Sequence, residues 1–209
     1  MPNLAFHVSR KLPRALLALA LLGTATIARA HTGNDAGLHH SFASGFVHPF
    51  TGLDHLSAML AVGLWSALSA AAIDRRVLWA PAGFAAMLLV GALLGFAGAE
   101  LPAVEPMIAA SVLVIGLLAA VRLRLPGWAA AALVGAFALF HGVAHGAELA
   151  GVAARWAVIG GMVGATLLLH AAGLGAGLLL RRTGRRGAWL AGGGIASVGA
   201  ALLGGALLA

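Results

Sequence analysis

The sequence predicts an all-α, polytopic membrane protein in which six transmembrane helices follow a cleaved signal peptide. Three observations support this fold class: 61% of the residues are hydrophobic and only 9% are charged, six apolar runs follow one another, and a leader-like segment precedes them. Such a composition lies far from that of soluble globular domains. We therefore expect a signal peptide at residues 1–30 and a six-helix transmembrane domain at residues 31–209.

The first thirty residues have the three parts of a secretory signal peptide. Three basic residues lie within positions 1–14, residues 15–27 are apolar, and residues 28–30 read Ala-Arg-Ala, a small-residue cleavage pattern. The apolar run is shorter than the roughly 20 residues that a spanning helix needs. Cleavage would make His31 the N-terminus, so that its amine and imidazole could both bind a metal. An uncleaved first anchor is the alternative.

Six apolar runs after the leader are each expected to form a transmembrane helix. They cover residues 53–73, 77–98, 107–121, 128–143, 155–180 and 188–209. The third and fourth are short and need flanking residues to complete a span. Glycines within the runs are expected to let helix backbones approach closely. The candidates are the GxxxG pairs Gly91 with Gly95 and Gly160 with Gly164, together with Gly173, Gly175 and Gly177.

Arginines between the runs predict the orientation of the helices. Eight of them follow the first, third and fifth runs: Arg75, Arg76, Arg122, Arg124, Arg181, Arg182, Arg185 and Arg186. Cytoplasmic loops are enriched in Lys and Arg, so we place these ends in the cytoplasm. The mature N-terminus and the C-terminus are then periplasmic, in the inner membrane of a bacterium. Trp79, Trp128 and Trp189 begin the second, fourth and sixth runs and are expected to anchor them at the inner interface.

Charge and cysteine content exclude several function classes. Four of the thirteen basic residues lie in the leader, which leaves nine basic and six acidic residues, a net charge of +3, for residues 31–209. The arginines form short clusters between apolar runs rather than a stripe, so no nucleic-acid partner is expected. The absence of cysteine excludes disulfides, Cys-type zinc sites and thiol catalysis. No Walker-type phosphate loop occurs, which argues against transport driven by ATP hydrolysis in this chain.

A first polar cluster stands at the mouth of the first apolar run, where the chain reads HPFTGLDHLSAM from His48 to Met59. Polar and ionisable side chains are costly in a membrane helix and mark functional candidates. Imidazole and carboxylate groups suit nickel, cobalt and zinc, whereas a Cu(I) site would be richer in sulfur. His48, Asp54 and His55 are therefore candidate ligands, with Met59 as a weaker one.

Asp54 also has a purely structural interpretation. Thr51 to Asp54 has the form of a capping box, in which Asp54 would satisfy backbone amides, and Pro49 would suit a turn that enters the helix. For Asp54 alone, capping and metal binding are equally well supported. The two histidines favour a metal site, because neither is needed to begin a helix.

A second cluster, FHGVAHGAE, lies near the outer end of the fourth run. On a helix, His141, His145 and Glu148 are spaced by four and three residues and share one face, which favours a ligand set. Zinc peptidases of the HExxH type need a glutamate directly after the first histidine, and this chain has Gly142 there. Hydrogen-bonded histidines at an interfacial helix end are the alternative. Because both clusters fall on the outer side, they can meet in space.

Two further ionisable residues are candidates. Glu105 lies just before the third run in VEPMIAAS, followed by Pro106 at a favoured first helical position. It is either a loop acid or another carboxylate for a cation. His170 lies deep in the fifth run, where such a residue usually has a partner or lines a wet cavity. An inner relay position and a structural hydrogen bond are equally consistent with its place.

The chain resembles the HupE/UreJ family of membrane proteins, regarded as nickel or cobalt permeases associated with hydrogenase and urease maturation. The matching pieces are GFVHPFTGLDHLSAMLAVGLW, VEPMIAAS and FHGVAHGAE, in order after the leader. The resemblance implies uptake of Ni²⁺ from the periplasm by a secondary transporter or facilitator. Co²⁺ is the next candidate and Zn²⁺ a third. The resemblance implies no permanently bound cofactor. It also implies partners in the nickel-enzyme maturation machinery. The implied functional residues are His48, Asp54, His55, Glu105, His141, His145 and Glu148.

Two other functions use the same residue types. A membrane-embedded zinc hydrolase would hold Zn²⁺ with histidines and an aspartate and activate water, with Glu148 or Asp54 as the general base. A bis-histidine haem protein would need paired histidines near the middle of the membrane, where His170 has no evident partner. We therefore expect a transporter rather than an enzyme.

Overall fold

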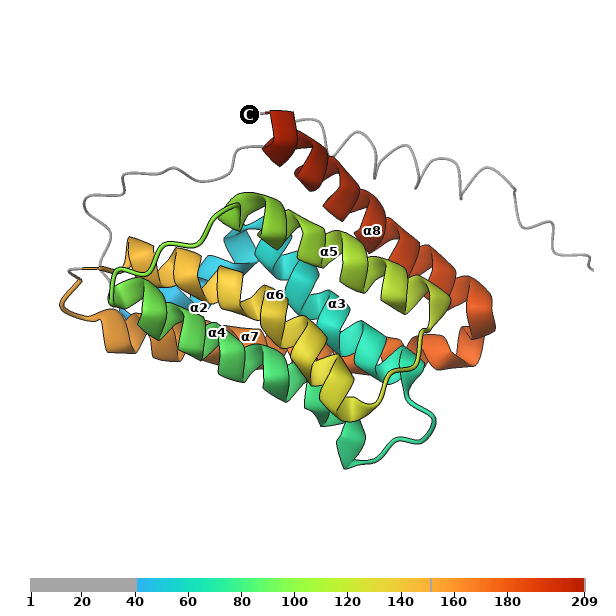
Figure 1. The fold of residues 1–209 in the computed structure, drawn as a ribbon. Coiled ribbons are helices and arrows are strands. Elements are labelled where there is room, and N and C mark those ends of the chain that lie inside the picture. The colour runs from blue at the N-terminus through green and yellow to red at the C-terminus, as the bar shows by residue number, and fades with distance from the viewer. Residues whose placement is uncertain (1–40, 151, 209) are drawn as a thin grey trace, which may run out of the picture. The chain divides into compact units, whose positions relative to one another are not determined.

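The computed structural model describes residues 41–150 and 152–208, in which loops connect helices and no strand occurs (Figure 1). Its helices are α2 (Phe42–Thr51), α3 (Leu53–Ser69), α4 (Trp79–Phe96), α5 (Val104–Val121), α6 (Gly127–Glu148), α7 (Arg155–Leu180) and α8 (Gly184–Leu208). Two short 3-10 segments, η1 (Arg75–Leu78) and η2 (Arg181–Thr183), precede α4 and α8. The predicted signal peptide and His31 lie outside the described residues.

The six predicted apolar runs coincide with α3 to α8, which confirms the all-helical class. Within the described residues, four stretches are long and apolar enough to cross a membrane: Arg75–Phe96, Val104–Val121, Gly127–Glu148 and Arg155–Leu208. The last stretch contains both α7 and α8, whereas α3 has 17 residues and is not among the four. Six crossings therefore remain a prediction.

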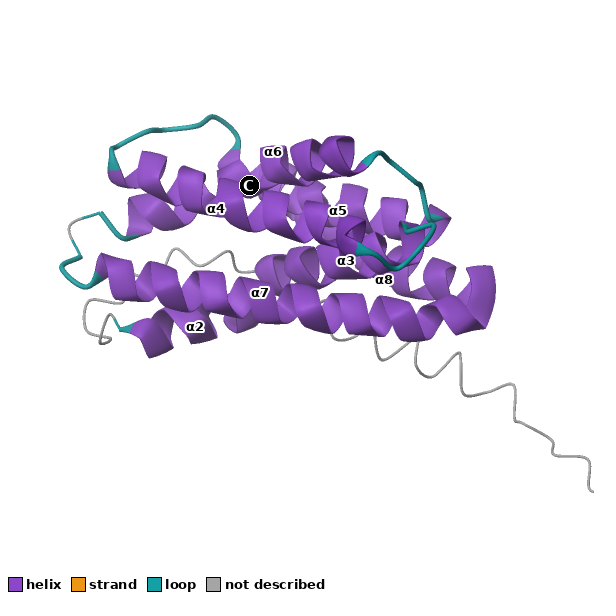
Figure 2. Cartoon of the chain, turned by 90° about the horizontal axis from the view of Figure 1, so that it is seen from below, coloured by secondary structure: helices purple, strands orange, loops and turns teal. Residues whose placement is uncertain are grey.

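Helix α2 is a correction to the sequence interpretation, which placed no helix before residue 53 and put Pro49 in a turn. Ser41 caps α2 through a capping box with Ser44, and Pro49 is inside the last turn. Three aromatic residues spaced by four, Phe42, Phe46 and Phe50, line one side of the helix: the first two rings are stacked at 6.2 Å between centroids, and the last two are tilted at 5.8 Å. Helix α2 lies beside α7 (Figure 2). A short helix of this kind is stabilised by packing rather than by length.

The α4–α6 pair is held by glycines on both helices. A Cβ atom on Gly91 or Gly95 of α4, or on Gly142 or Gly146 of α6, would overlap backbone atoms of the other helix. The predicted close approach at Gly91 and Gly95 is therefore confirmed. Small residues allow such contact because no side chain separates the two backbones.

The expectation for Gly160 and Gly164 is wrong. A Cβ atom at either position would meet only the phenylalanine rings of α2, at 3.8 Å, which is an ordinary contact. Gly161 makes the close approach instead, against the backbone of α2. Gly173 and Gly177 pack closely on α3, as expected, but Gly175 has nothing within 4 Å of the added atom.

Helix α3 is the most buried helix of this bundle, and its C-terminal end is held by arginines. Arg181 donates from Nη1 to the carbonyls of Ala67, at 2.9 Å, and Ala70, at 2.8 Å. Arg122 donates from Nε to the carbonyl of Leu68 at 3.0 Å. These bonds satisfy carbonyls that a helix end leaves without partners. The arginine-bearing connections thus meet at one end of α3, and His55 in its first turn lies at the other.

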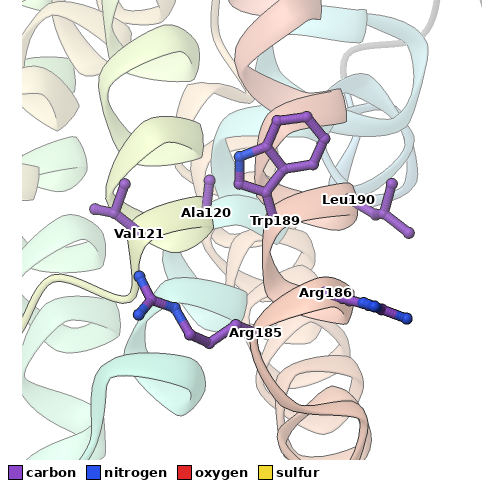
Figure 3. Close-up of a pocket in the computed structure, with 6 residues that line it drawn as sticks. All are labelled: Ala120, Val121, Arg185, Arg186, Trp189 and Leu190. Atoms are coloured by element: carbon purple, nitrogen blue, oxygen red, sulfur yellow. The ribbon is translucent and has the colours of Figure 1, made fainter.

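A groove of about 540 Å³ lies at this arginine-rich end, between the end of α5 and the start of α8, which pack on each other (Figures 1 and 3). In Figure 3 the side chain of Arg185 extends toward Val121, whereas Arg186 points away. Its lining residues are Ala120, Val121, Arg185, Arg186, Trp189 and Leu190. None of them is a predicted metal ligand, so the groove is separate from the candidate site.

Candidate metal-binding site

The first cluster is shaped by the break between α2 and α3. Gly52 alone separates the two helices and has an extended conformation, with φ −94° and ψ 122°. His48 lies in the last turn of α2 and His55 in the first turns of α3. The bend brings their rings to a centroid distance of 6.0 Å. The sequence HPFTGLDH therefore folds as helix, bend and helix, with its two histidines close together.

The second cluster owes its orientation to the glycines that follow its histidines. Gly142 and Gly146 pack against α4, and each preceding residue lies 100° around the helix. His141 and His145 are consequently turned toward α3 and are buried, at 0% and 3% exposure. Helix α6 also continues past the predicted end at residue 143, so that Glu148 is its last residue.

The two clusters meet, although almost one hundred residues separate His48 from His145 in the sequence. Their ring centroids are 4.8 Å apart, and the ring of His55 lies 4.5 Å from that of His145 and 4.9 Å from that of His141. One ligand atom each from His48, His145 and Glu148 lies within 4.8 Å of the other two. Small side-chain movements would close this spacing around an ion with bonds of about 2.0–2.2 Å.

His55 is oriented by the neighbouring carboxylate. Oδ1 of Asp54 accepts from the backbone N–H of His55 at 2.8 Å and from its Nδ1 at 2.9 Å. An ionised carboxylate can only accept, so Nδ1 carries a hydrogen and Nε2 is the ring nitrogen that can offer a lone pair. Nε2 is buried and has no hydrogen-bond partner among the described residues. This is how carboxylates commonly orient metal-binding histidines.

The capping box expected from Thr51 to Asp54 does not form. Thr51 donates its hydroxyl to the carbonyl of His48 at 2.7 Å, and Gly52, the N-cap of α3, receives no side-chain cap. The physical reason is that α2 ends at Thr51, whose hydroxyl is used to close that last turn. Asp54 binds one backbone amide, but through the same oxygen that it offers to the imidazole of His55.

His141 and His145 are held in a related way. Nδ1 of His145 lies 3.6 Å from Oε2 of Glu148, and its Nε2 has no partner among the described residues. Nε2 of His141 lies 3.0 Å from the hydroxyl of Ser111, which gives its only hydrogen to the carbonyl of Ile108 at 2.6 Å. His141 must therefore donate from Nε2, which leaves its Nδ1 with a lone pair and without a partner in the described chain.

Several residues that the sequence predicted as metal ligands lie outside the two clusters. Glu105 is exposed in the first turn of α5, and Pro106 is the third residue of that helix rather than the first, because α5 begins at Val104. Met59 is buried in α3, and its sulfur lies 3.4 Å from the hydroxyl of Thr166, which donates to the carbonyl of Met162 at 2.8 Å. His170 is buried in α7. Their roles in metal binding remain predictions.

Two residues that contact the histidines were missed in the sequence. Ser111 is 0% exposed and ends the matching piece VEPMIAAS, where a hydroxyl within an apolar helix is the signal that could have found it. Phe84 of α4 is also 0% exposed, with its ring 5.5 Å from that of His141 and 5.2 Å from that of His170. No spacing rule distinguishes Phe84 from the other apolar residues of its run.

Comparisons with known proteins identify the family to which the sequence is similar. The family model described as HupE / UreJ protein matches residues 19–202. A relative from Rhizobium leguminosarum bv. viciae, "Protein HupE", is 41% identical over 187 residues, which cover 88% of this chain and 94% of the relative. No solved structure matches the chain.

Proposed function

This chain belongs to the HupE/UreJ family, and from that premise we propose that it is a secondary transporter or facilitator for divalent transition-metal ions. The family is associated with hydrogenase and urease accessory function in nickel and cobalt supply. Ni²⁺ is the expected substrate, followed by Co²⁺ and Zn²⁺. The histidine end of the bundle would face the periplasm of a bacterium and the arginine-rich end its cytoplasm.

One observation carries the proposal more than any other. His48 of α2 and His145 and Glu148 of α6 bring ligand atoms to within 4.8 Å of one another. Helices distant in the chain would gain nothing in packing from gathering imidazoles and a carboxylate, because apolar residues would fill the space at lower cost. A divalent cation explains both the ligand types and their proximity.

The arrangement supports capture followed by release. Glu148 is 57% exposed and His145 only 3%, so a hydrated ion would first meet the carboxylate and then exchange water for imidazole. Asp54 and Ser111 hold His55 and His141 in the tautomers that keep a lone pair for metal. Mixed imidazole and carboxylate ligands bind firmly enough to select and weakly enough to release, as conduction requires.

The test is uptake of radioactive Ni²⁺ or Co²⁺ into proteoliposomes that contain the purified protein. Glu148→Gln and His145→Ala are expected to lose uptake, because each removes a ligand of the group. Glu100→Gln is the matched control, since Glu100 is an exposed acid outside the group. Unchanged uptake by well-folded Glu148→Gln and His145→Ala would refute the assignment.

The same purified sample separates this proposal from a zinc hydrolase. A transporter is expected to exchange its metal and to bind it without hydrolytic turnover. Stoichiometric zinc that does not exchange would favour the hydrolase.

The nickel-enzyme maturation machinery is the expected acceptor of the ion on the cytoplasmic side.

A further inference from the structure

His170 is a buried imidazole outside the candidate metal site. We call the residues of that site the outer group: His48, Asp54, His55, His141, His145 and Glu148. It lies in α7 with 2% exposure, and neither ring nitrogen has a hydrogen-bond partner among the described residues. A buried polar group without a partner costs about 1–3 kcal/mol. In a membrane helix, such an ionisable residue commonly marks an ion pathway. The structural hydrogen bond that the sequence allowed for His170 does not form within the described chain.

His170 lies deeper in the bundle than the outer histidines. Gly63 of α3 packs directly against the backbone carbonyl of His170. Gly63 follows His55 by eight residues on the same helix, which corresponds to a rise of about 12 Å. The backbone of His170 is therefore two turns further from the histidine end of α3, toward the end held by Arg122 and Arg181.

A continuous series of rings joins His170 to the outer group. Each ring in the series contacts the next, the rings come from five helices (α2, α3, α4, α6 and α7), and the step from the outer group to His170 is made by Phe84. The centroid distances are 4.8 Å for His48–His145, 4.5 Å for His145–His55, 4.9 Å for His55–His141, 5.5 Å for His141–Phe84 and 5.2 Å for Phe84–His170. One aromatic ring thus separates the outer imidazoles from the inner one.

Packing alone does not account for a histidine at this position. The ring of His170 meets that of Phe84 edge to face, with an interplanar angle of 89°. A leucine or phenylalanine could fill the same space without two unsatisfied nitrogens, and large apolar residues surround the site in the bundle core. The imidazole therefore supplies a group that packing does not require: a ring nitrogen whose lone pair can bind a ligand.

We propose that His170 is an inner station for the transported divalent cation, which reaches it from the outer histidines past the ring of Phe84. This inference rests on the proposed transport function. A borderline metal such as Ni²⁺ or Co²⁺ accepts imidazole nitrogen readily. A station with fewer protein ligands than the outer group binds the ion more weakly, which eases release of the ion from that station.

The experiment compares His170→Leu and His170→Gln with the intact protein in proteoliposomes. Uptake of radioactive Co²⁺ gives the maximal rate, and equilibrium binding to the detergent-solubilised protein gives the affinity of the outer group. We expect both variants to lose most of the maximal uptake rate while the outer affinity is unchanged. Leu168→Ala, an exposed position on the same helix, is the control and should retain both properties.

Other outcomes would overturn the inference. Wild-type uptake rates in both variants would show that no ion depends on His170. Loss of outer binding in both variants, together with uptake, would show that His170 only supports the fold of the outer group. If the intact protein itself accumulates no metal, the proposed transport function fails, and that result is distinguishable because it does not depend on any variant.

Discussion

The carboxylate of Asp54 and the imidazole of His55 form a hydrogen-bonded pair of sequence neighbours, with Oδ1 and Nδ1 2.9 Å apart. The same oxygen also binds the backbone N–H of His55 at 2.8 Å, so both side chain and backbone of His55 are oriented by one group. Asp54 was expected as a metal ligand or as a helix cap. Its geometry favours a positioning role, in which it sets the tautomer of a ligand.

Asp54→Asn is predicted to weaken metal binding by about 10–100-fold, the usual effect of removing an orienting carboxylate. The amide can still accept from the backbone, but it no longer carries the charge that favours Nδ1–H on His55. Asp74→Asn is the control, because Asp74 caps η1 at the arginine-rich end. Equilibrium Co²⁺ binding measures the change, and equal affinities for the two variants would contradict the positioning role.

Ser111→Ala is predicted to lower metal affinity by about tenfold or more. The substitution leaves Nε2 of His141 without its acceptor, so that the hydrogen can move to Nδ1 and occupy the lone pair intended for metal. Ser197→Ala is a matched control, since Ser197 is exposed on α8 and donates to the carbonyl of Gly193 on its own helix. The absorption spectrum of bound Co²⁺ reports loss of a nitrogen ligand. A spectrum identical to that of the intact protein would exclude this role for Ser111.

Gly146→Ala is predicted to destabilise the protein by about 1–3 kcal/mol, because the added methyl group must separate α6 from the backbone of α4. The change also displaces His145, its neighbour, so metal binding should weaken. Gly175→Ala is the control: nothing lies within 4 Å of its added atom, and alanine favours a helix by about 0.5–1 kcal/mol. Thermal unfolding in detergent compares them. Similar Tm values would show that the α4–α6 contact tolerates expansion.

The helices and the two histidine clusters could be predicted from the sequence for different reasons. Apolar runs identify α3 to α8 because these segments are continuously apolar over most of the length of a helix. The spacing of His141, His145 and Glu148 predicts a shared face because α6 continues through them. Helix α2 was missed because ten residues are too few to form such a run, although Phe42, Phe46 and Phe50 already show a four-residue spacing.

Side-chain detail could not be predicted because it depends on how the helices are rotated against one another. The GxxxG pattern at Gly160 and Gly164 gives a spacing but does not say which side of the helix a neighbour covers. The backbone of α2 packs on Gly161 instead. Likewise, nothing in the sequence assigns the single hydroxyl hydrogen of Ser111 to Ile108 rather than to His141. Both outcomes follow from contacts between helices, which a one-dimensional pattern does not contain.

Arg181→Ala is predicted to lower the free energy of unfolding by about 1.5–3 kcal/mol, the contribution of hydrogen bonds from a charged donor. Arg181 is the only residue of the described chain shown to bind the carbonyls of Ala67 and Ala70, which end the most buried helix. Arg182→Ala removes the same charge one residue away, at an exposed side chain, and should change stability little. Thermal unfolding of both variants in one detergent gives the comparison. Because surface charges alone contribute little, an equal loss of Tm in the two variants would mean that the positive charge of this end, and not the carbonyl contacts of Arg181, stabilises α3.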